Sequence, residues 1–350
     1  MVDDDIRKIK DIPIIFIVGI GRSGTTLLQE LLDSHTQIAA PPECDFVAYL
    51  YPKFGKIKSY SEQDIYKFID ALFSQPIIQT WLLNKEELTA KLIAAKHLLN
   101  YQVLCKMVFY QTRRDKSNII LFSDKFPEYS LFTKKLLKIF PEAKFVHIIR
   151  DPRDNANSRI KSLPYKNTFF NAWNWLGFNT SIEKVKYKYP AKFFTIKYEA
   201  MVQNVEETLK SLCTFLQVPY EDGMRHNKFA AKLNLYSNTN MYDVFKKIHH
   251  NMLQPVNTGN IGKWKIELSK RDQIIVEKIT GGYAKLQYGY EIELDKMEYR
   301  KVSIYKLIKS KIIYIIWVFF TRLRFSNYWL NTIYKDRKLK PFREKHNLKK

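Results

Sequence analysis

Four short apolar runs divide the chain and predict buried strands. They cover residues 12–20, 118–123, 143–150 and 192–198. The first run, IPIIFIVGI, is rich in β-branched residues and has no alternating polar positions. Uninterrupted runs of this kind are typical of strands that are covered on both faces in a parallel sheet.

Helical spacing separates these runs. After the first, Leu27, Leu28, Leu31 and Leu32 lie on one helical face. Residues 45–117 show mostly helical periodicity, and further helices are predicted at 130–140, after Pro152, at 169–188 and at 205–216. Alternating strands and helices predict an α/β fold of three layers, with a central parallel sheet flanked by helices.

The alternation of predicted strands and helices ends at residues 289–295, and this change predicts two regions. Residues 1–295 form the α/β domain, and residues 296–350 form a basic, aromatic-rich helical extension. The chain carries 58 Lys and Arg against 35 Asp and Glu, a net charge of +23. The extension holds 16 basic and 3 acidic residues, so more than half of the excess charge lies there.

Within the extension, residues 312–320 read IIYIIWVFF, a run too short to span a bilayer. Basic residues flank it from Lys306 to Arg324. This arrangement suits peripheral contact with an anionic membrane through residues 304–324. A helix that packs back on the domain or on a second subunit fits the pattern equally well, so both interpretations remain open.

Composition narrows the class of protein. With 46% hydrophobic residues the chain can bury a large core, which excludes wholesale disorder. Its three cysteines are far apart, no histidine spacing indicates a metal site, and RNA-binding signatures are missing. We therefore expect no metal and no nucleic-acid partner. No secretory signal is evident, so a cytoplasmic protein is expected, located at the inner membrane face if the extension binds lipid.

A candidate phosphate loop follows the first strand. Gly19 and Gly24 bracket the segment GIGRSG, which lies between a buried strand and a helix. Small residues here allow backbone N–H groups to surround a phosphate at the helix N-terminus. In nucleoside triphosphate-binding loops a Lys follows the last Gly, whereas this chain has Thr25. The loop therefore suits a phosphate group, but not magnesium-assisted phosphoryl transfer.

Two motifs together resemble the sulfotransferases that use 3′-phosphoadenosine 5′-phosphosulfate (PAPS). The segment GIGRSGTTLLQELLDSH resembles their 5′-phosphosulfate loop, and FVHIIRDPRDNANS resembles their 3′-phosphate element. Weaker similarity continues through IKYEAMV, PVNTGNIGKW and LQYGYE. The motif spacing is closest to the Golgi-type branch, which includes tyrosylprotein and carbohydrate sulfotransferases. The resemblance covers about residues 12–295 and implies a P-loop-type fold.

The resemblance implies which residues hold the donor. The 5′-phosphosulfate would be bound by Arg22, Ser23, Gly24, Thr25 and Thr26. Arg150 and Ser158 would bind the 3′-phosphate, and Tyr198, Lys263 and Trp264 resemble further donor contacts. Two alternatives remain: Asp151, Arg153 and Asp154 as a solvated capping cluster with Arg150 paired locally, and Trp264 as a core residue.

The resemblance also implies the catalytic residues. Glu43 stands where the Golgi-type branch has its catalytic base, and a base is needed to deprotonate an acceptor hydroxyl. Lys125 and Arg22 would stabilise charge around the transferred group. His35 is a rival base, but its place at a helix end favours a packing role.

The acceptor is expected to be a hydroxyl of a glycan or of a lipid-linked saccharide. Residues 45–117 and the helix that carries Trp173 and Trp175 are predicted to line its side of the site. Two other functions remain as alternatives: a P-loop kinase-like phosphotransferase, and a catalytically inactive basic membrane protein.

Overall fold

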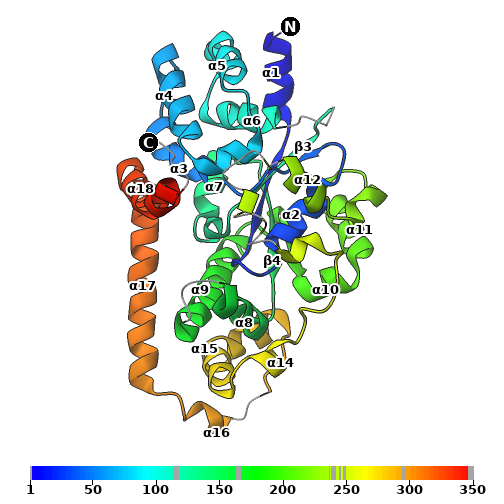
Figure 1. Cartoon of the computed structure of the whole chain (residues 1–350), viewed down its shortest axis with the longest axis vertical. Helices are drawn as coiled ribbons and strands as arrows, with labels where there is room; N and C mark the ends of the chain where they lie inside the picture. The colour runs from blue at the N-terminus through cyan, green and yellow to red at the C-terminus, as the bar shows by residue number, and fades with distance from the viewer. Residues whose placement is uncertain are drawn as a thin grey trace.

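A five-stranded parallel sheet forms the centre of the molecule (Figure 1). The computed structural model describes residues 2–112, 118–162, 167–235, 237, 242–243, 246, 250–293 and 296–345. The strand order is β2-β3-β1-β4-β5, and every pairing is parallel. The strands are β1 (Ile14–Val18), β2 (Ile38–Ala39), β3 (Leu121–Lys125), β4 (Lys144–Ile149) and β5 (Phe193–Lys197).

The four predicted strands are confirmed, and β2 is an additional one. It has only two residues, too few for an apolar run to be recognised in the sequence. Its pairing places Ile38 and Ala39 beside Leu121 and Phe122 at the start of β3. β2 thus directs the following loop toward the same sheet edge as the other strand ends.

Helices cover both faces of the sheet, as predicted. Ile15 and Ile17 of β1 pack in one core with leucines of α2 and α11, whereas Phe16 belongs to the core on the opposite face. The helices are α1 (Val2–Asp11), α2 (Thr25–Asp33), α3 (Phe46–Phe54), α4 (Glu62–Phe73), α5 (Lys85–Ala94), α6 (Tyr101–Gln111), α7 (Thr133–Ile139), α8 (Pro152–Ser162), α9 (Thr168–Lys186), α10 (Tyr198–Gln203), α11 (Val205–Leu216), α12 (Phe229–Leu235), α14 (Trp264–Glu267), α15 (Lys270–Tyr288), α16 (Lys296–Tyr299), α17 (Ile304–Ser326) and α18 (Tyr328–Lys345).

The predicted helical segments are confirmed, with one change. The segment expected at 130–140 consists of a 3₁₀ turn, Pro127–Leu131, followed by α7. Between 45 and 112 the regular elements are α3 to α6 and two 3₁₀ helices, joined by short turns, and residues 113–117 lie outside the described part. Trp175 of α9 is buried, and its indole nitrogen donates to the backbone oxygen of Arg150 at 2.9 Å. This tryptophan therefore supports the sheet edge as a core residue.

The described part of the C-terminal extension, residues 296–345, is mainly helical and packs on the α/β domain. α17 runs along α9, and α18 contacts α3 (Figure 1). A Cβ atom on Gly177 of α9 would lie 1.8 Å from the Tyr314 hydroxyl oxygen of α17, so the two helices approach closely there. Residues 294–295 lie outside the described part, so the boundary at 295–296 stays a prediction. Of the helices described, none combines the length and the apolarity needed to cross a bilayer.

Candidate active site

The sequence-predicted residues converge at the carboxyl ends of the strands. Arg22 follows β1, Glu43 follows β2, Lys125 ends β3, Arg150 follows β4 and Tyr198 follows β5. Parallel strands place their carboxyl ends at one edge of the sheet, where open α/β folds bind ligands. Each strand thus contributes at least one predicted site residue, although the residues are separated widely in the sequence.

The loop between β1 and α2 requires its glycines. Gly19 has φ 148°, and a Cβ atom there would lie 2.3 Å from the backbone oxygen of Ile148. Gly24 has φ 94°, and its Cβ would lie 2.5 Å from the Tyr198 ring. Arg22 itself adopts the left-handed region at φ 72°. Side chains other than hydrogen at both glycines would push this loop away from β4 and Tyr198.

Two arginines place positive charge beside this loop without a carboxylate partner. Arg150 donates to the backbone oxygens of Arg22 at 3.1 Å and Asn260 at 2.5 Å, and its buried Nε has no partner. Its guanidinium also lies 4.6 Å from the centre of the Tyr198 ring. Within the described residues, neither Arg22 nor Arg150 forms an ion pair. Burial, and then the charge of Arg150, lowers the pKa of Arg22.

Helix α8 connects the two predicted phosphate elements. Arg22 Nε donates to the Ser158 hydroxyl at 3.2 Å, so the residues assigned to opposite ends of the donor are in contact. Asn155 Nδ2 donates to the Gly21 backbone oxygen at 3.1 Å and to the Ser23 hydroxyl at 3.0 Å. α8 therefore fixes the β1–α2 loop directly.

Glu43 and Lys125 form an ion pair next to the start of α2. Lys125 Nζ contacts the Glu43 carboxylate and donates to the Thr26 hydroxyl at 3.2 Å. The Lys125 side chain is 1% exposed, whereas that of Glu43 is 37% exposed. The carboxylate can therefore meet a substrate from solvent, while the lysine lies between it and the phosphate loop.

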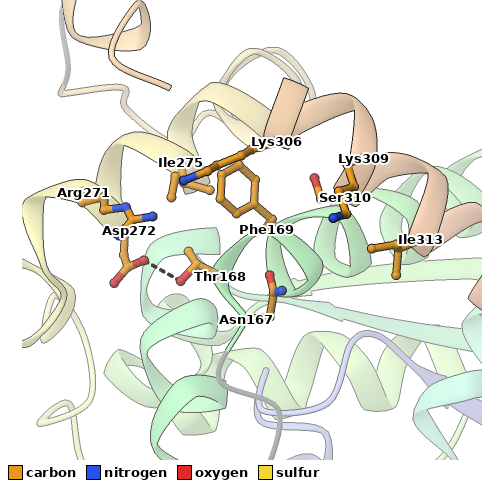
Figure 2. A pocket seen from close by; sticks show the side chains of 10 residues that line it. All are labelled: Asn167, Thr168, Phe169, Arg271, Asp272, Ile275, Lys306, Lys309, Ser310 and Ile313. Carbon is orange, nitrogen blue, oxygen red and sulfur yellow. Dashed lines mark hydrogen bonds between the residues drawn. The ribbon is translucent and has the colours of Figure 1, made fainter. Parts of the chain in front are cut away.

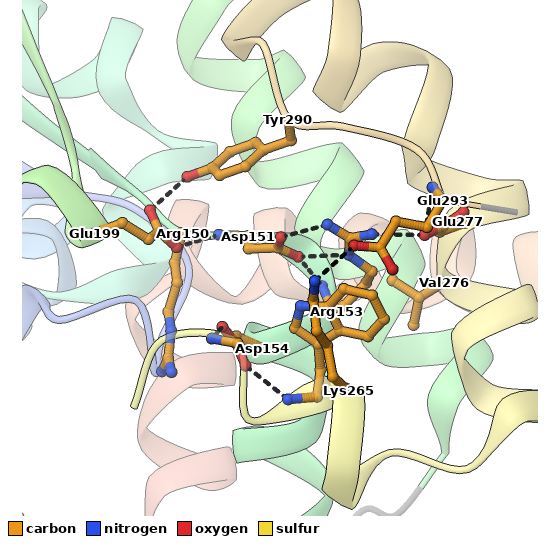
Figure 3. A network of polar contacts seen from close by, with 12 residues as sticks. Arg150, Asp151, Arg153, Asp154, Glu199, Lys265, Val276, Glu277, Tyr290 and Glu293 are labelled. Carbon is orange, nitrogen blue, oxygen red and sulfur yellow. Dashed lines mark hydrogen bonds and ion pairs between the residues drawn. The ribbon is translucent and has the colours of Figure 1, made fainter. Parts of the chain in front are cut away.

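The polar cluster around Arg153 is structural and buried (Figure 3). Arg153 pairs with Asp151 and with Glu277 of α15, both at 2.7 Å, and its guanidinium lies 3.8 Å from the Trp264 ring centre. The expected alternative of a solvated capping cluster is wrong, because Asp151, Arg153 and Asp154 are all buried. This network anchors the start of α8.

Lys263 and Trp264 differ in their surroundings. Asp154 accepts hydrogen bonds from the backbone N–H groups of Gly262 at 2.7 Å and Trp264 at 3.0 Å. Trp264 is 4% exposed, and its ring stacks against the Arg153 guanidinium. It therefore occupies a core position, which was one of the alternatives for this residue. Lys263 is exposed. Their predicted donor contacts stay predictions.

His35 is engaged away from this edge. Its side chain is fully buried, Nε2 lies 2.9 Å from the Pro219 backbone oxygen, and Nδ1 accepts from the Gln37 N–H at 3.0 Å. The packing role expected for this histidine agrees with these contacts.

Two further ionisable residues near the site were missed from the sequence. Burial, and then the charge of Glu43, raises the pKa of Glu128, which follows Lys125 by three positions. Burial lowers the pKa of Arg159 to about 10, and its electrostatic neighbours are Glu128 and Arg22. In the sequence, the signal for these two residues is their position: Glu128 is close to Lys125, and Arg159 directly follows Ser158.

The extension reaches the loop that carries Glu43. Lys335 of α18 pairs with the Asp45 carboxylate and donates to Gln75 Oε1 at 2.8 Å. Its ammonium lies 3.9 Å from the centre of the Tyr49 ring. The C-terminal region therefore supports the segment that immediately follows Glu43, a connection that its sequence does not reveal.

Asp124 should make stability depend on pH. Burial raises its pKa from the usual value near 3.8 to about 8, and Oδ2 has no hydrogen-bond partner among the described residues. A raised folded-state pKa stabilises the fold below pH 4, and this contribution is lost as the pH rises through 8. We expect Asp124→Asn to flatten the decline, which for one proton is at most about 1.4 kcal/mol per pH unit. Urea unfolding of the unchanged protein and of Asp124→Asn between pH 4 and pH 8 gives the free energy of unfolding at each pH. If the two proteins lose stability in parallel, the assignment to Asp124 is contradicted.

Metal ligands are not grouped at this edge. In the described part of the chain, no cluster of three or more His, Cys, Asp or Glu side chains could hold an ion. Cys44, Cys105 and Cys213 are free and buried.

Comparisons with known proteins indicate the family of this chain. The protein-tyrosine sulfotransferase 1 of Danio rerio is 25% identical over 283 residues, 76% of this chain and 70% of that protein. The protein-tyrosine sulfotransferase of Drosophila melanogaster is 24% identical over 267 residues, 73% of this chain and 47% of that protein. The sulfotransferase domain of the Synechococcus PCC 7002 olefin synthase has the same fold, with a TM-score of 0.53 and 19% identity over 80% of this chain and 95% of that domain.

The family model described as the sulfotransferase family matches residues 13–222. That range contains the phosphate loop, Glu43, Lys125, Arg150, Ser158 and Tyr198. This match favours sulfonate transfer over the two alternatives, a kinase-like phosphotransferase and an inactive membrane protein. The chain belongs to the sulfotransferase family.

Proposed function

We propose that this sulfotransferase moves a sulfonate from PAPS to the phenolic hydroxyl of a tyrosine in a protein or peptide. One observation supports the chemistry most directly. Arg22 and Arg150, neither of which forms an ion pair within the described residues, bring positive charge to the sheet edge that also holds the Glu43–Lys125 pair. A site with two such cations and a partly exposed carboxylate suits a polyanionic donor and an acceptor that must lose a proton.

The residues present fit PAPS as donor substrate. Arg22 is partly buried and Arg150 is buried, and neither forms an ion pair within the described residues, so both guanidinium groups favour an anion. The Nε proton of Arg150 still needs an acceptor. Arg150 and Ser158 would hold the 3′-phosphate. Arg22 and residues 23–26 would hold the 5′-phosphosulfate at the N-terminus of α2, where the helix dipole also favours negative charge. No metal is needed for these contacts.

The proposed reaction is an in-line displacement at sulfur. The acceptor oxygen forms a bond to sulfur as the bond between sulfur and the 5′-phosphate oxygen breaks, and adenosine 3′,5′-bisphosphate leaves. Glu43 accepts the hydroxyl proton. Lys125 lies between Glu43 and Thr26, where its ammonium can stabilise the charge that develops on the departing phosphate oxygen.

The proposed acceptor differs from the saccharide expected from the sequence. The relatives named above are protein-tyrosine sulfotransferases, which supports a tyrosine as acceptor here. Neither of these two relatives is named as a carbohydrate sulfotransferase, so the comparisons do not support a saccharide acceptor. The predicted acceptor side can serve a peptide, because the Glu43 carboxylate is 37% exposed and α3 begins three residues later, at Phe46.

Incubation with sulfur-labelled PAPS should label a tyrosine-containing peptide. The matched control is the same peptide with phenylalanine in place of tyrosine, which should remain unlabelled because it lacks the nucleophilic oxygen. Oligosaccharides and lipid-linked saccharides are assayed in parallel. Label in a saccharide and none in the tyrosine peptide would overturn the acceptor while leaving the donor chemistry intact.

A further inference from the structure

Helix α17 has two different faces. Tyr314, Thr321 and Phe325 are buried against the domain, and the Trp317 ring stacks on Phe178 of α9 with 6.2 Å between ring centres. No described residue covers the opposite face. The helix has 23 residues and is therefore about 35 Å long. It lies at the edge of the molecule (Figure 1).

The outward face of α17 is mainly apolar, and Lys309 is an exposed charge within it, in line with Ile316 and Phe320. Phe319 is 61% exposed and Phe320 60% exposed. Other exposed side chains recur at helical spacing on the same side: Ile304, Ile308, Ile312, Ile315, Ile316 and Leu323. Soluble proteins rarely leave a continuous apolar surface of this kind open to water, and such surfaces mark interaction sites.

Basic residues border this face on both sides. At 3.6 residues per turn, Lys311 and Arg322 fall along one border, and Lys306 and Arg324 along the other. Between Glu298 and Asp336 the sequence has no acidic residue. A second copy docked face to face would bring these cations together with no carboxylate from this helix to pair with them, which is unfavourable. An anionic surface complements them.

A groove beside the apolar face adds a place for an anion (Figure 2). It has a volume of about 490 Å³ and lies between α9, α15 and α17. Arg271, Lys306 and Lys309 line it, and none of the three forms an ion pair with a described carboxylate. Asp272 also lines it, but its carboxylate accepts from Thr168 at 2.5 Å and from Ser269 at 2.7 Å. The net charge of the groove is therefore positive.

We propose that the outward face of α17 docks on a membrane that contains anionic phospholipids. The helix lies in the plane of the membrane interface. Phe319, Phe320 and the exposed isoleucines insert among the acyl chains. Arg271, Lys306 and Lys309 of the groove bind the phosphate of a lipid headgroup. Apolar faces with basic borders bind membranes in this way. Helix α18 follows α17 directly and packs against it, and Lys335 of α18 contacts Asp45, so the docked region also borders the loop that carries Glu43.

Vesicle co-sedimentation of the full chain tests the docking. We expect binding to phosphatidylcholine vesicles that contain phosphatidylglycerol, weaker binding as salt is raised, and little binding to pure phosphatidylcholine. Phe319→Ser/Phe320→Ser should lower the partition coefficient at least about 10-fold, since two large apolar side chains are lost. The control is Ile266→Ser/Leu286→Ser, two residues that are 92% and 90% exposed elsewhere and should have no effect.

A second pair of variants tests the groove. Lys306→Glu/Lys309→Glu should lower binding to the anionic vesicles about 10-fold or more. The same reversal at the exposed Lys184 and Lys188 of the α9 region gives an equal net charge and should have a smaller effect. If the phenylalanine pair unfolds the protein, as circular dichroism would reveal, this second comparison decides.

Three results would overturn the proposal. They are no binding of the intact chain to anionic vesicles, equal losses in the α17 variants and their controls, and a stable dimer that Phe319→Ser/Phe320→Ser dissociates. The last result would assign the face to a second copy. Binding of adenosine 3′,5′-bisphosphate is measured on every variant and should not change, so failure of the membrane proposal is distinguishable from failure of the proposed function.

Discussion

Replacing Glu43 by glutamine should lower kcat by about 10²–10⁴-fold, the usual contribution of a general base. The amide cannot accept the acceptor proton, but it preserves size and can remain beside Lys125. The site for the donor should therefore persist. Initial rates with labelled PAPS and saturating acceptor give kcat, and calorimetric titration with adenosine 3′,5′-bisphosphate gives the affinity for the nucleotide.

Glu128→Gln is the matched control for this experiment. Glu128 is another carboxylate near the site, and burial together with Glu43 raises its pKa, so it is a reasonable rival base. We expect the substitution at Glu43 to cost far more activity than the one at Glu128. The reverse order would transfer the role of base to Glu128, and full activity of Glu43→Gln would exclude Glu43.

The sheet edge could be predicted because its signals are local. Strand β1 is an uninterrupted apolar run, the segments of β3, β4 and β5 contain shorter apolar stretches, and residues of the phosphate loop stand directly beside Gly19 and Gly24. Parallel pairing then brings Arg22, Lys125 and Arg150 to one edge without any further information. Glu43 was placed by motif spacing alone, because β2 is too short to be recognised.

The contacts that could not be predicted join distant segments. Arg153 pairs with Glu277 across 124 positions, and Lys335 donates to Gln75 across 260 positions. Charged residues in the sequence look solvated until the fold supplies their partners. For this reason the residues around Arg153 resembled a surface cluster, and the extension appeared separate from the site.

Replacing Arg150 by methionine should weaken the binding of adenosine 3′,5′-bisphosphate by about 100-fold. Loss of charge-assisted hydrogen bonds costs about 1.5–3 kcal/mol each, and Arg150 would make at least one with the 3′-phosphate. Burial of Arg150 strengthens the effect, because water replaces the lost charge poorly in a buried site. Calorimetry on the variant and the unchanged protein measures the difference.

Adenosine 5′-phosphate separates the 3′-phosphate contact from a general loss of structure, because this ligand has no 3′-phosphate. Its affinity should fall much less in Arg150→Met than that of the bisphosphate. Arg225→Met serves as the matched variant, since Arg225 is an exposed arginine that pairs with Glu206 and Asp222. It should bind both nucleotides normally. If Arg150→Met weakens both ligands equally, Arg150 supports the loop through the backbone oxygens of Arg22 and Asn260 and does not bind the 3′-phosphate.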